Sequence, residues 1–132
     1  MPLNNDNYTH RMQTLLFVLF VASLTVVLHG IGTEHNWYWR YHWFDIITHL
    51  LGGFSLGLLA VLLYRKIEKC VVFTLGTVLL LIIGWEVFEV LFVSMPTEEL
   101  WYSIGTIKDV VVGLLGAHIA VFVYQKYSRT VA

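Results

Sequence analysis

The chain has 132 residues and a formal net charge of -1, and 58% of its residues are hydrophobic while only 13% are charged. Its mean hydropathy of +0.71 and its low charge lie outside the range of ordinary soluble domains, where about 25% of residues are charged, so water is not its main solvent. The small net charge argues against a nucleic-acid partner, which requires a clustered basic surface.

Four apolar segments follow one another along the chain. A bilayer core of about 30 Å needs roughly 20 mostly apolar residues per helical crossing, and residues 12–30, 44–64, 70–93 and 107–127 meet this requirement. The first segment exceeds the usual signal-peptide core of about 7–15 apolar residues and is not followed by a small-x-small cleavage site, so we expect it to be retained. The sequence predicts an all-α fold, an integral membrane bundle of four transmembrane helices, as a single domain over residues 1–132.

The loops differ in their content of lysine and arginine. With four spans, both terminal tails and the middle loop share one side of the membrane, and this side holds Arg11, Arg65, Lys66, Lys69, Lys126 and Arg129. The opposite side holds only Arg40 and Lys108. Because short cytoplasmic loops carry an excess of these residues, we predict a multi-pass protein of the cell inner (plasma) membrane with both termini in the cytoplasm.

An aromatic segment follows the first span. Residues 36–44 read Asn-Trp-Tyr-Trp-Arg-Tyr-His-Trp-Phe, and amphipathic aromatic rings favour the headgroup zone of a bilayer. We predict that this segment lies along the outer membrane interface, joined by Trp101 and Tyr102 from the second outer loop. A platform for a lipid or glycan headgroup is the functional alternative.

The spans also contain ionisable side chains, although a charged group in hydrocarbon costs about 2.5 kcal/mol or more. Asp45 and His49 are four residues apart in the second span and therefore share one face of a helix. Glu86 and Glu89 are three residues apart in the third span and share a face in the same way. Each of these groups needs a partner, a neutral protonation state or a watery cavity.

The remaining polar groups near the same level are His29, at the end of the first span, and Lys108 and Asp109, at the start of the fourth. Alternate spans run in opposite directions, so the end of an odd span is level with the start of an even one. At 1.5 Å per residue, the two glutamates lie about 6–11 Å below the outer end of their helix, and His49 lies about 7–9 Å below the outer end of its own. We therefore predict one shallow polar layer near the outer membrane face.

The carboxylates of this layer require neutralisation, because like charges packed together in a low-dielectric pocket cannot all stay ionised. One solution uses protonated His29 and His49, with Lys108 and Arg40 reaching in. The other is a divalent metal ion (Zn, Mn or Fe) held by oxygen and imidazole ligands. The candidate metal ligands are Asp45, His49, Glu86, Glu89 and Asp109. Neither HExxH nor the Glu-x-x-His pairs of di-iron bundles occurs in the sequence, so both solutions stay open.

Two further residues are set apart from the polar layer. His118 follows Asp109 by nine residues, which places it ~13 Å deeper and on the opposite side of the helix. We predict that His118 is a separate, hydrogen-bonded histidine. Cys70 is the single cysteine of the chain, and we interpret it as an inert interfacial thiol because it has no partner for a disulfide or a CxxC motif.

The second and fourth spans share a sequence pattern. The segment that starts at Asp45, D-I-I-T-H-L-L-G-G, aligns with the segment that starts at Asp109, D-V-V-V-G-L-L-G-A. Both spans run inward, so the pattern indicates two tandem helical hairpins related by a pseudo-two-fold axis along the membrane normal. The small residues of both segments would let the two backbones approach closely, which favours packing between helices in lipid.

The polar residues also carry a resemblance to a known family. The order D-x-x-x-H with a glycine-rich continuation (Asp45, His49), then E-x-x-E (Glu86, Glu89), then D-x-x-x-G-x-x-G (from Asp109) resembles the YjdF-like family of bacterial membrane proteins and is similar to the broader VanZ-like group. VanZ-like proteins typically have Gln at the second position of the E-x-x-E pair, where this chain has Glu, which favours the YjdF-like side. The resemblance covers residues 43–120 and implies a polytopic bacterial membrane protein. VanZ-like members are linked to glycopeptide-antibiotic tolerance, and YjdF-like members have no assigned activity.

A transporter that uses the carboxylates as proton relays is the weakest hypothesis for a single protomer, because below the level of Glu86 the spans contain only His118 as a further relay group. Three other kinds of function are compatible with this sequence. We favour the coarsest, a polytopic membrane protein with an outer-facing intramembrane Asp/His/Glu site that is a candidate for metal binding. The first alternative is an enzyme of the cell envelope that acts on a lipid headgroup or a lipid-linked substrate, with Glu86 or Glu89 as the catalytic general base. The second is a structural or assembly subunit of a membrane complex. The expected partner is membrane lipid, and a homo-oligomer or membrane-complex partner stays open.

Overall fold

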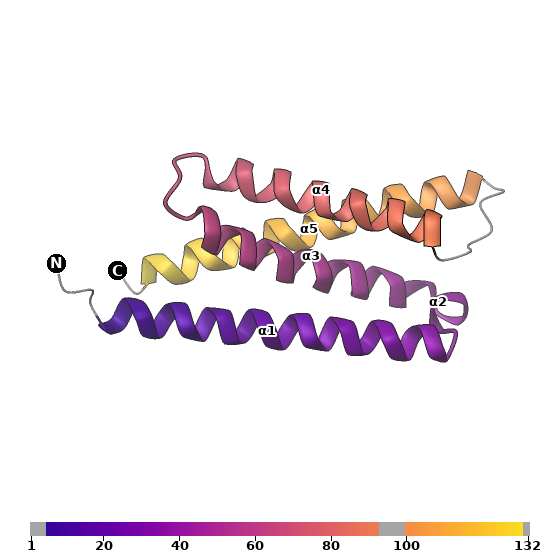
Figure 1. Ribbon diagram of the computed structural model, residues 1–132, viewed down its shortest axis with the longest axis horizontal. Helices are drawn as coiled ribbons and strands as arrows, with labels where there is room; N and C mark the ends of the chain where they lie inside the picture. Colours follow the sequence, from indigo (N-terminus) through magenta and orange to yellow (C-terminus); the bar gives the residue numbers. More distant parts are fainter. Residues whose placement is uncertain (1–4, 93–99, 131–132) are drawn as a thin grey trace.

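The computed structural model of the protein describes residues 5–92 and 100–130, with side chains for residues 8, 9, 11–92 and 105–128. Its elements are the helices α1 (Asn5–Glu34), α2 (Trp37–Arg40), α3 (His42–Tyr64), α4 (Cys70–Phe92) and α5 (Leu100–Thr130) (Figure 1). Four stretches are long and apolar enough to cross a membrane: Arg11–Glu34, His42–Tyr64, Cys70–Phe92 and Gly105–Ser128. The predicted all-α bundle with four transmembrane helices is therefore confirmed, and the exact limits of each span within the membrane stay predictions.

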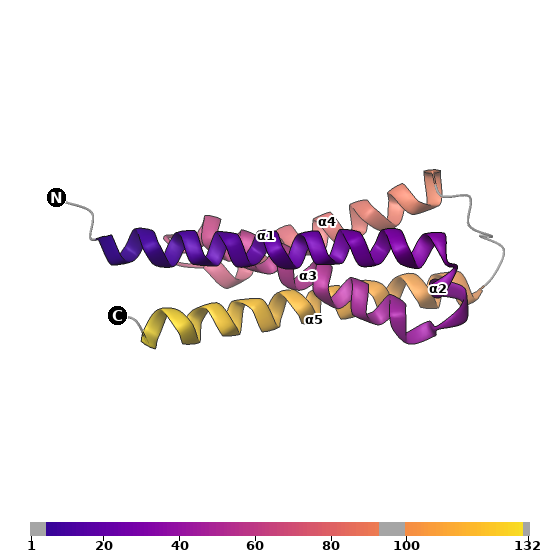
Figure 2. The same cartoon turned by 90° about the horizontal axis from the view of Figure 1, so that it is seen from below.

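The four long helices lie alongside one another, with both chain termini at one end of the bundle and α2 at the other (Figures 1 and 2). We call these the terminal end and the α2 end. Helices α1 and α4 run toward the α2 end, whereas α3 and α5 run away from it. Helix α3 is central, because it packs most extensively against α5 and also packs against α1 and α4. Helices α3 and α5 are thus parallel neighbours.

Small residues bring the backbones of α3 and α5 into direct contact. A Cβ atom on Gly53 would overlap the backbone of Gly113, and a Cβ atom on Gly57 would lie 2.7 Å from the Cα of Ala117. Lipid provides no hydrophobic drive for helix association, so van der Waals contact at such close approach holds transmembrane helices together. These residues fix how α3 and α5 are aligned, and they thereby position the polar side chains one to two turns above them.

Buried apolar side chains fill the space between the helices in two clusters. One cluster joins α3, α4 and α5 through Ala60, Val78, Ile82 and Ala117. The other joins α1, α3 and α5 through Val18, Leu58 and Ala120. Many large apolar side chains are instead exposed along all four long helices, and a surface of this kind suits contact with lipid chains rather than with water.

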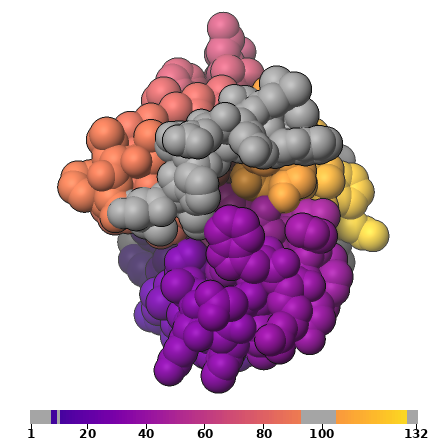
Figure 3. Space-filling view, turned by 90° about the vertical axis from the view of Figure 1, so that its right-hand side faces the viewer, coloured from indigo at the N-terminus to yellow at the C-terminus, as the bar shows by residue number. Residues whose placement is uncertain are grey.

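The aromatic segment forms the cap of the α2 end. Helix α1 ends at Glu34, and Asn36 then adopts the left-handed conformation (φ 56°, ψ 34°), which asparagine tolerates better than most residues. This turn leads into α2, whose Trp39 is exposed, while the ring of Phe44 in α3 is buried against Trp37 and Tyr38. Figure 3 views the molecule from this end. The backbone at residues 101 and 102 belongs to α5, and the predicted interfacial role of the Trp101 and Tyr102 side chains lies outside the described side chains.

Candidate functional site

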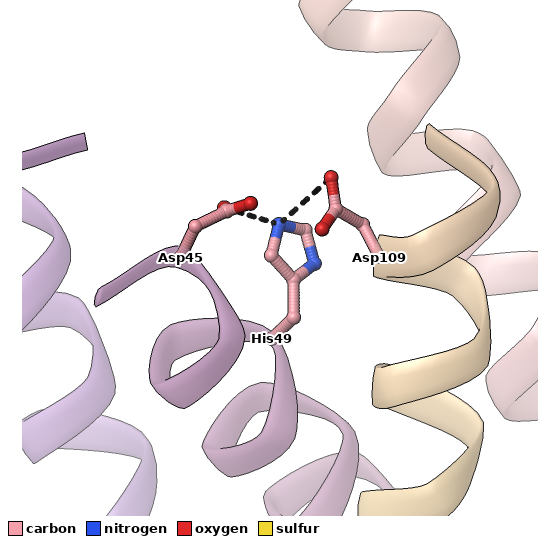
Figure 4. Close-up of side chains that lie close together, drawn as sticks. All are labelled: Asp45, His49 and Asp109. Atoms are coloured by element: carbon pink, nitrogen blue, oxygen red, sulfur yellow. Dashed lines mark ion pairs between the residues drawn. The ribbon is translucent and has the colours of Figure 1, made fainter. Parts of the chain in front are cut away.

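Three polar side chains meet between α3 and α5 near the α2 end. The Nε2 atom of His49 lies 3.3 Å from Asp45 Oδ1 and 3.9 Å from Asp109 Oδ2, and Figure 4 shows the imidazole ring between the two carboxylates. One ligand atom from each of these residues lies within 4.8 Å of the other two. The four-residue spacing puts Asp45 and His49 on one face of α3, and the glycine-mediated contact with α5 brings Asp109 to that face. We call these three residues the Asp–His–Asp site.

Lys108 bridges the two carboxylates of the site. Its Nζ atom donates a hydrogen bond to Asp45 Oδ2 at 2.5 Å and lies 3.3 Å from Asp109 Oδ1. The lysine side chain is 39% exposed, so it covers the edge of the site rather than its interior. Lys108 thus reaches in as the protein-only solution predicts. Arg40 does not: it is exposed and forms no ion pair with the residues that the structure describes.

Glu86 is the buried carboxyl of α4 and lies next to the Asp–His–Asp site. It is only 6% exposed. It interacts electrostatically with Glu89 and His49, and its side chain also interacts with that of Thr106. Its Oε1 atom is buried and has no hydrogen-bond partner among the described residues. A buried polar atom without a partner costs about 1–3 kcal/mol. A bound ion, water molecule or ligand that contacts this oxygen would remove the cost.

Glu89 is not part of the Asp–His–Asp site and pairs with Trp85 instead. Its Oε1 atom accepts a hydrogen bond from the Trp85 indole nitrogen at 2.9 Å, in a partly exposed position. The group of three residues whose ligand atoms lie within 4.8 Å of one another contains neither Glu86 nor Glu89. Of the five candidate metal ligands, the structure therefore brings three into one group and pairs Glu89 with Trp85, while Glu86 is buried in α4 and interacts with the group electrostatically.

A second polar group links three helices beside the site, and of its members the sequence predicted only His29 as part of the polar layer. His29 Nδ1 of α1 lies 2.7 Å from the Tyr38 hydroxyl of α2, which lies 3.4 Å from Thr48 Oγ1 of α3. The His29 ring also packs edge-on against Trp85 at 5.7 Å between ring centroids. Burial raises the pKa of the Tyr38 phenol above its ordinary value, so the phenol stays protonated and donates at neutral pH. The aromatic composition of residues 36–44 predicted only an interfacial position for Tyr38, because nothing in the local pattern distinguishes it from its neighbours.

We expect the substitution Tyr38→Phe to lower the free energy of unfolding by about 1 kcal/mol, because His29 and Thr48 both lose a hydrogen-bond partner. The measurement is unfolding of the purified protein by titration with a denaturing detergent. Tyr41→Phe is the matched control, since Tyr41 is exposed and its hydroxyl makes no hydrogen bond with a described residue. Equal stability of the two variants would contradict the role assigned to Tyr38.

His118 is separate from the site, as its position along the helix predicts. It is exposed on α5. The hydrogen bond predicted for His118 is not found among the residues that the structure describes. Cys70 is a free, partly buried thiol whose Sγ lies 3.9 Å from the Val61 carbonyl oxygen.

Four helices that are long and apolar enough to cross a membrane enclose a partly buried polar site. The molecule is therefore a polytopic α-helical membrane protein. A family model described as "Predicted membrane protein (DUF2238)" matches residues 4–130. The match covers nearly the whole chain, so the protein belongs to the DUF2238 family, which is the YjdF-like family. The resemblance to that family is confirmed over a longer stretch than residues 43–120, while the relation to the VanZ-like group and a bacterial origin stay predictions. No curated protein and no solved structure matches the chain significantly.

Proposed function

We propose that this protein binds a divalent metal ion at the Asp–His–Asp site and uses it on a lipid headgroup or lipid-linked substrate at the membrane surface. The observation that carries the proposal is the convergence of three ligand atoms within 4.8 Å. They come from two helices whose backbones touch, so the protein scaffold holds them in place without a ligand. Such preorganisation is what a metal centre requires of its protein.

The ligand chemistry restricts the choice of ion. One imidazole nitrogen and two carboxylate oxygens form a mixed set that suits Zn, Mn or Fe better than the all-oxygen sites of Ca or Mg. Three protein ligands also leave coordination positions open for water or substrate, as catalytic rather than structural zinc sites do. This set of ligands therefore favours a catalytic metal site over a purely structural one.

Glu86 is the residue that we assign as general base. A carboxylate within reach of metal-bound water can accept its proton and so generate a nucleophile. Glu86 interacts electrostatically with His49 and has a buried oxygen without a hydrogen-bond partner among the described residues, whereas the Glu89 carboxylate already accepts a hydrogen bond from Trp85. Of the two catalytic candidates, Glu86 is thus favoured over Glu89.

The position of the site within the bundle supports a substrate at the membrane surface. The site lies one to two turns inside the start of α3, close to the aromatic α2 end, where exposed Trp39 and Trp43 suit the headgroup zone. The excess of lysine and arginine at the terminal end supports an extracytoplasmic α2 end. A lipid headgroup of the outer leaflet is the substrate class that lies at this depth.

Elemental analysis of the detergent-purified protein tests the proposal. After loading with Zn, Mn or Fe and removal of free metal, we expect about one ion per chain, as for a three-ligand site. We expect His49→Ala to lose at least about tenfold in affinity, because it removes the only nitrogen ligand of the site. His42→Ala is the matched control, since His42 is exposed at the start of the same helix. The proposal fails if the wild-type protein retains none of the three metals, or if both variants retain them equally.

One observation favours a second candidate function, a structural lock without metal. The ammonium group of Lys108 already contacts both aspartates, and Lys108 together with a protonated His49 balances the two negative charges. The site would then only hold α3 against α5, as in a structural subunit of a membrane complex. Substitution of Lys108 separates the two candidates, as argued in the Discussion.

A further inference from the structure

His118 occupies an unusual place in the bundle. It lies on an exposed face of α5, thirteen residues into the span Gly105–Ser128 and ten residues from its other end. At 1.5 Å per residue it is therefore about 15–20 Å from either end of the span, near the middle of the membrane. No described residue of the chain provides it with a hydrogen bond or an ion pair.

This position is costly in a monomer. Ionisable side chains inside transmembrane segments normally face the bundle interior or pair with another polar group, because hydrocarbon satisfies neither their charge nor their hydrogen bonds. The other ionisable side chains of the described spans lie within the polar layer or toward the terminal end. The imidazole of His118 therefore requires a partner from outside the described part of this chain.

The residues around His118 form a continuous exposed stripe. Val111, Leu115 and Phe122 are 59%, 53% and 63% exposed, and with His118 they follow a spacing of four, three and four residues. This spacing is that of the a and d positions along the contact line of two helices in a left-handed pair. We call these four residues the His118 stripe. A single polar residue in such a contact line commonly fixes the register of two identical helices.

We propose that the His118 stripe is the contact surface of a homodimer, in which α5 packs against α5 of a second copy. Two copies inserted in the same orientation are related by an axis along the membrane normal, so each residue meets its counterpart at equal depth. His118 is the single polar residue of the stripe, and a neutral imidazole both donates and accepts a hydrogen bond. The counterpart His118 is thus the group that satisfies it, and no foreign polar residue needs to match its depth.

This inference is independent of the proposed metal site. His118 lies nine residues beyond Asp109 on the opposite side of α5, so the stripe faces away from the Asp–His–Asp site. Failure of metal binding leaves the dimer proposal unaffected, and a monomeric protein leaves the metal proposal unaffected.

Disulfide cross-linking of the full-length protein in liposomes tests the proposal. In a Cys70→Ser background, we expect Leu115→Cys and Phe122→Cys to form dimers under mild oxidation at least about fivefold faster than Leu80→Cys, since only stripe residues face their counterparts at contact distance. Leu80 is the matched control because it is 72% exposed on α4 near the middle of the membrane. Equal rates at all three positions, or no cross-linking in the stripe, would overturn the proposed surface.

The role of His118 itself has a separate readout. Adding His118→Leu to the Leu115→Cys protein should slow cross-linking by roughly three- to tenfold, the effect of one lost hydrogen bond between transmembrane helices. His118→Asn keeps a group that donates and accepts, and we expect it to retain most of the rate. An unchanged rate with His118→Leu would show that the imidazole does not hold the two copies together. Because His118 is exposed, neither substitution disturbs the packing of the bundle core.

Discussion

The substitution Gly53→Val should lower the free energy of unfolding by about 3 kcal/mol, the upper part of the usual range for overpacking. A Cβ atom at this position overlaps the backbone of Gly113, and neither backbone can move without separating α3 from α5. Gly53 lies one turn of α3 below His49, so the same separation should pull Asp109 away from the ring of His49. We therefore expect both lower stability, measured by denaturing-detergent titration, and weaker retention of metal.

The matched control for this substitution is Gly76→Val on α4. A Cβ atom on Gly76 has no neighbour within 4 Å, so valine there extends into open space. We expect a change in stability within about 0.5 kcal/mol, as for other surface substitutions. If the two valine variants unfold alike, close packing between α3 and α5 is not what holds the bundle together.

Removing the charge of Lys108 has the second large effect. In the presence of a chelator, Lys108→Met leaves Asp45 and Asp109 facing each other without the ammonium group that contacts both. Breaking a fully buried pair costs about 3–5 kcal/mol, and the partial exposure of Lys108 reduces the expected loss to about 1–3 kcal/mol. Unfolding of the chelator-treated variant, compared with Lys66→Met in the exposed loop at the terminal end, measures this loss.

Metal added to the Lys108→Met protein separates the two candidate functions. If the site binds a divalent cation, the ion replaces the lost positive charge, restores stability and binds about three- to tenfold more tightly than in the wild type, because no ammonium group competes for the same oxygens. If the site is only a lock, metal restores nothing. A Lys108→Met protein that remains destabilised at saturating Zn, Mn and Fe would therefore exclude the metal site and favour the lock.

Much of the architecture follows from helix geometry applied to the sequence. Four apolar runs of sufficient length predict four spans, and the rise of 1.5 Å per residue predicts which residues share a depth. The structure brings four of the predicted polar residues into one contact network, Asp45, His49, Lys108 and Asp109, and His29 packs against Tyr38 and Trp85; the outer-facing position of the layer stays a prediction. The depth of a residue is predictable because it depends only on the position of the residue in its helix and on the constant helical rise per residue.

The grouping of residues within that layer was not predictable. Glu86 and Glu89 are three residues apart and share a broad face of α4, yet one is buried beside His49 and the other bonds to Trp85 near the surface. Which of them turns inward depends on the rotation of α4 about its axis. That rotation is set by side-chain packing against α3 and α5, and the sequence pattern of a helix that is apolar on all sides contains little information about it.

The sequence by itself determined that this is a four-span membrane protein with a polar layer near one end, because length and hydropathy are local properties of each segment. Only the tertiary structure decided that Asp45, His49 and Asp109 form one site, that Tyr38 belongs to a hydrogen-bonded group beside it and that His118 faces outward. These outcomes depend on how far apart the helices lie and how each is rotated. Both are decided by contacts between residues distant in the chain, above all the close approach of Gly53 to Gly113.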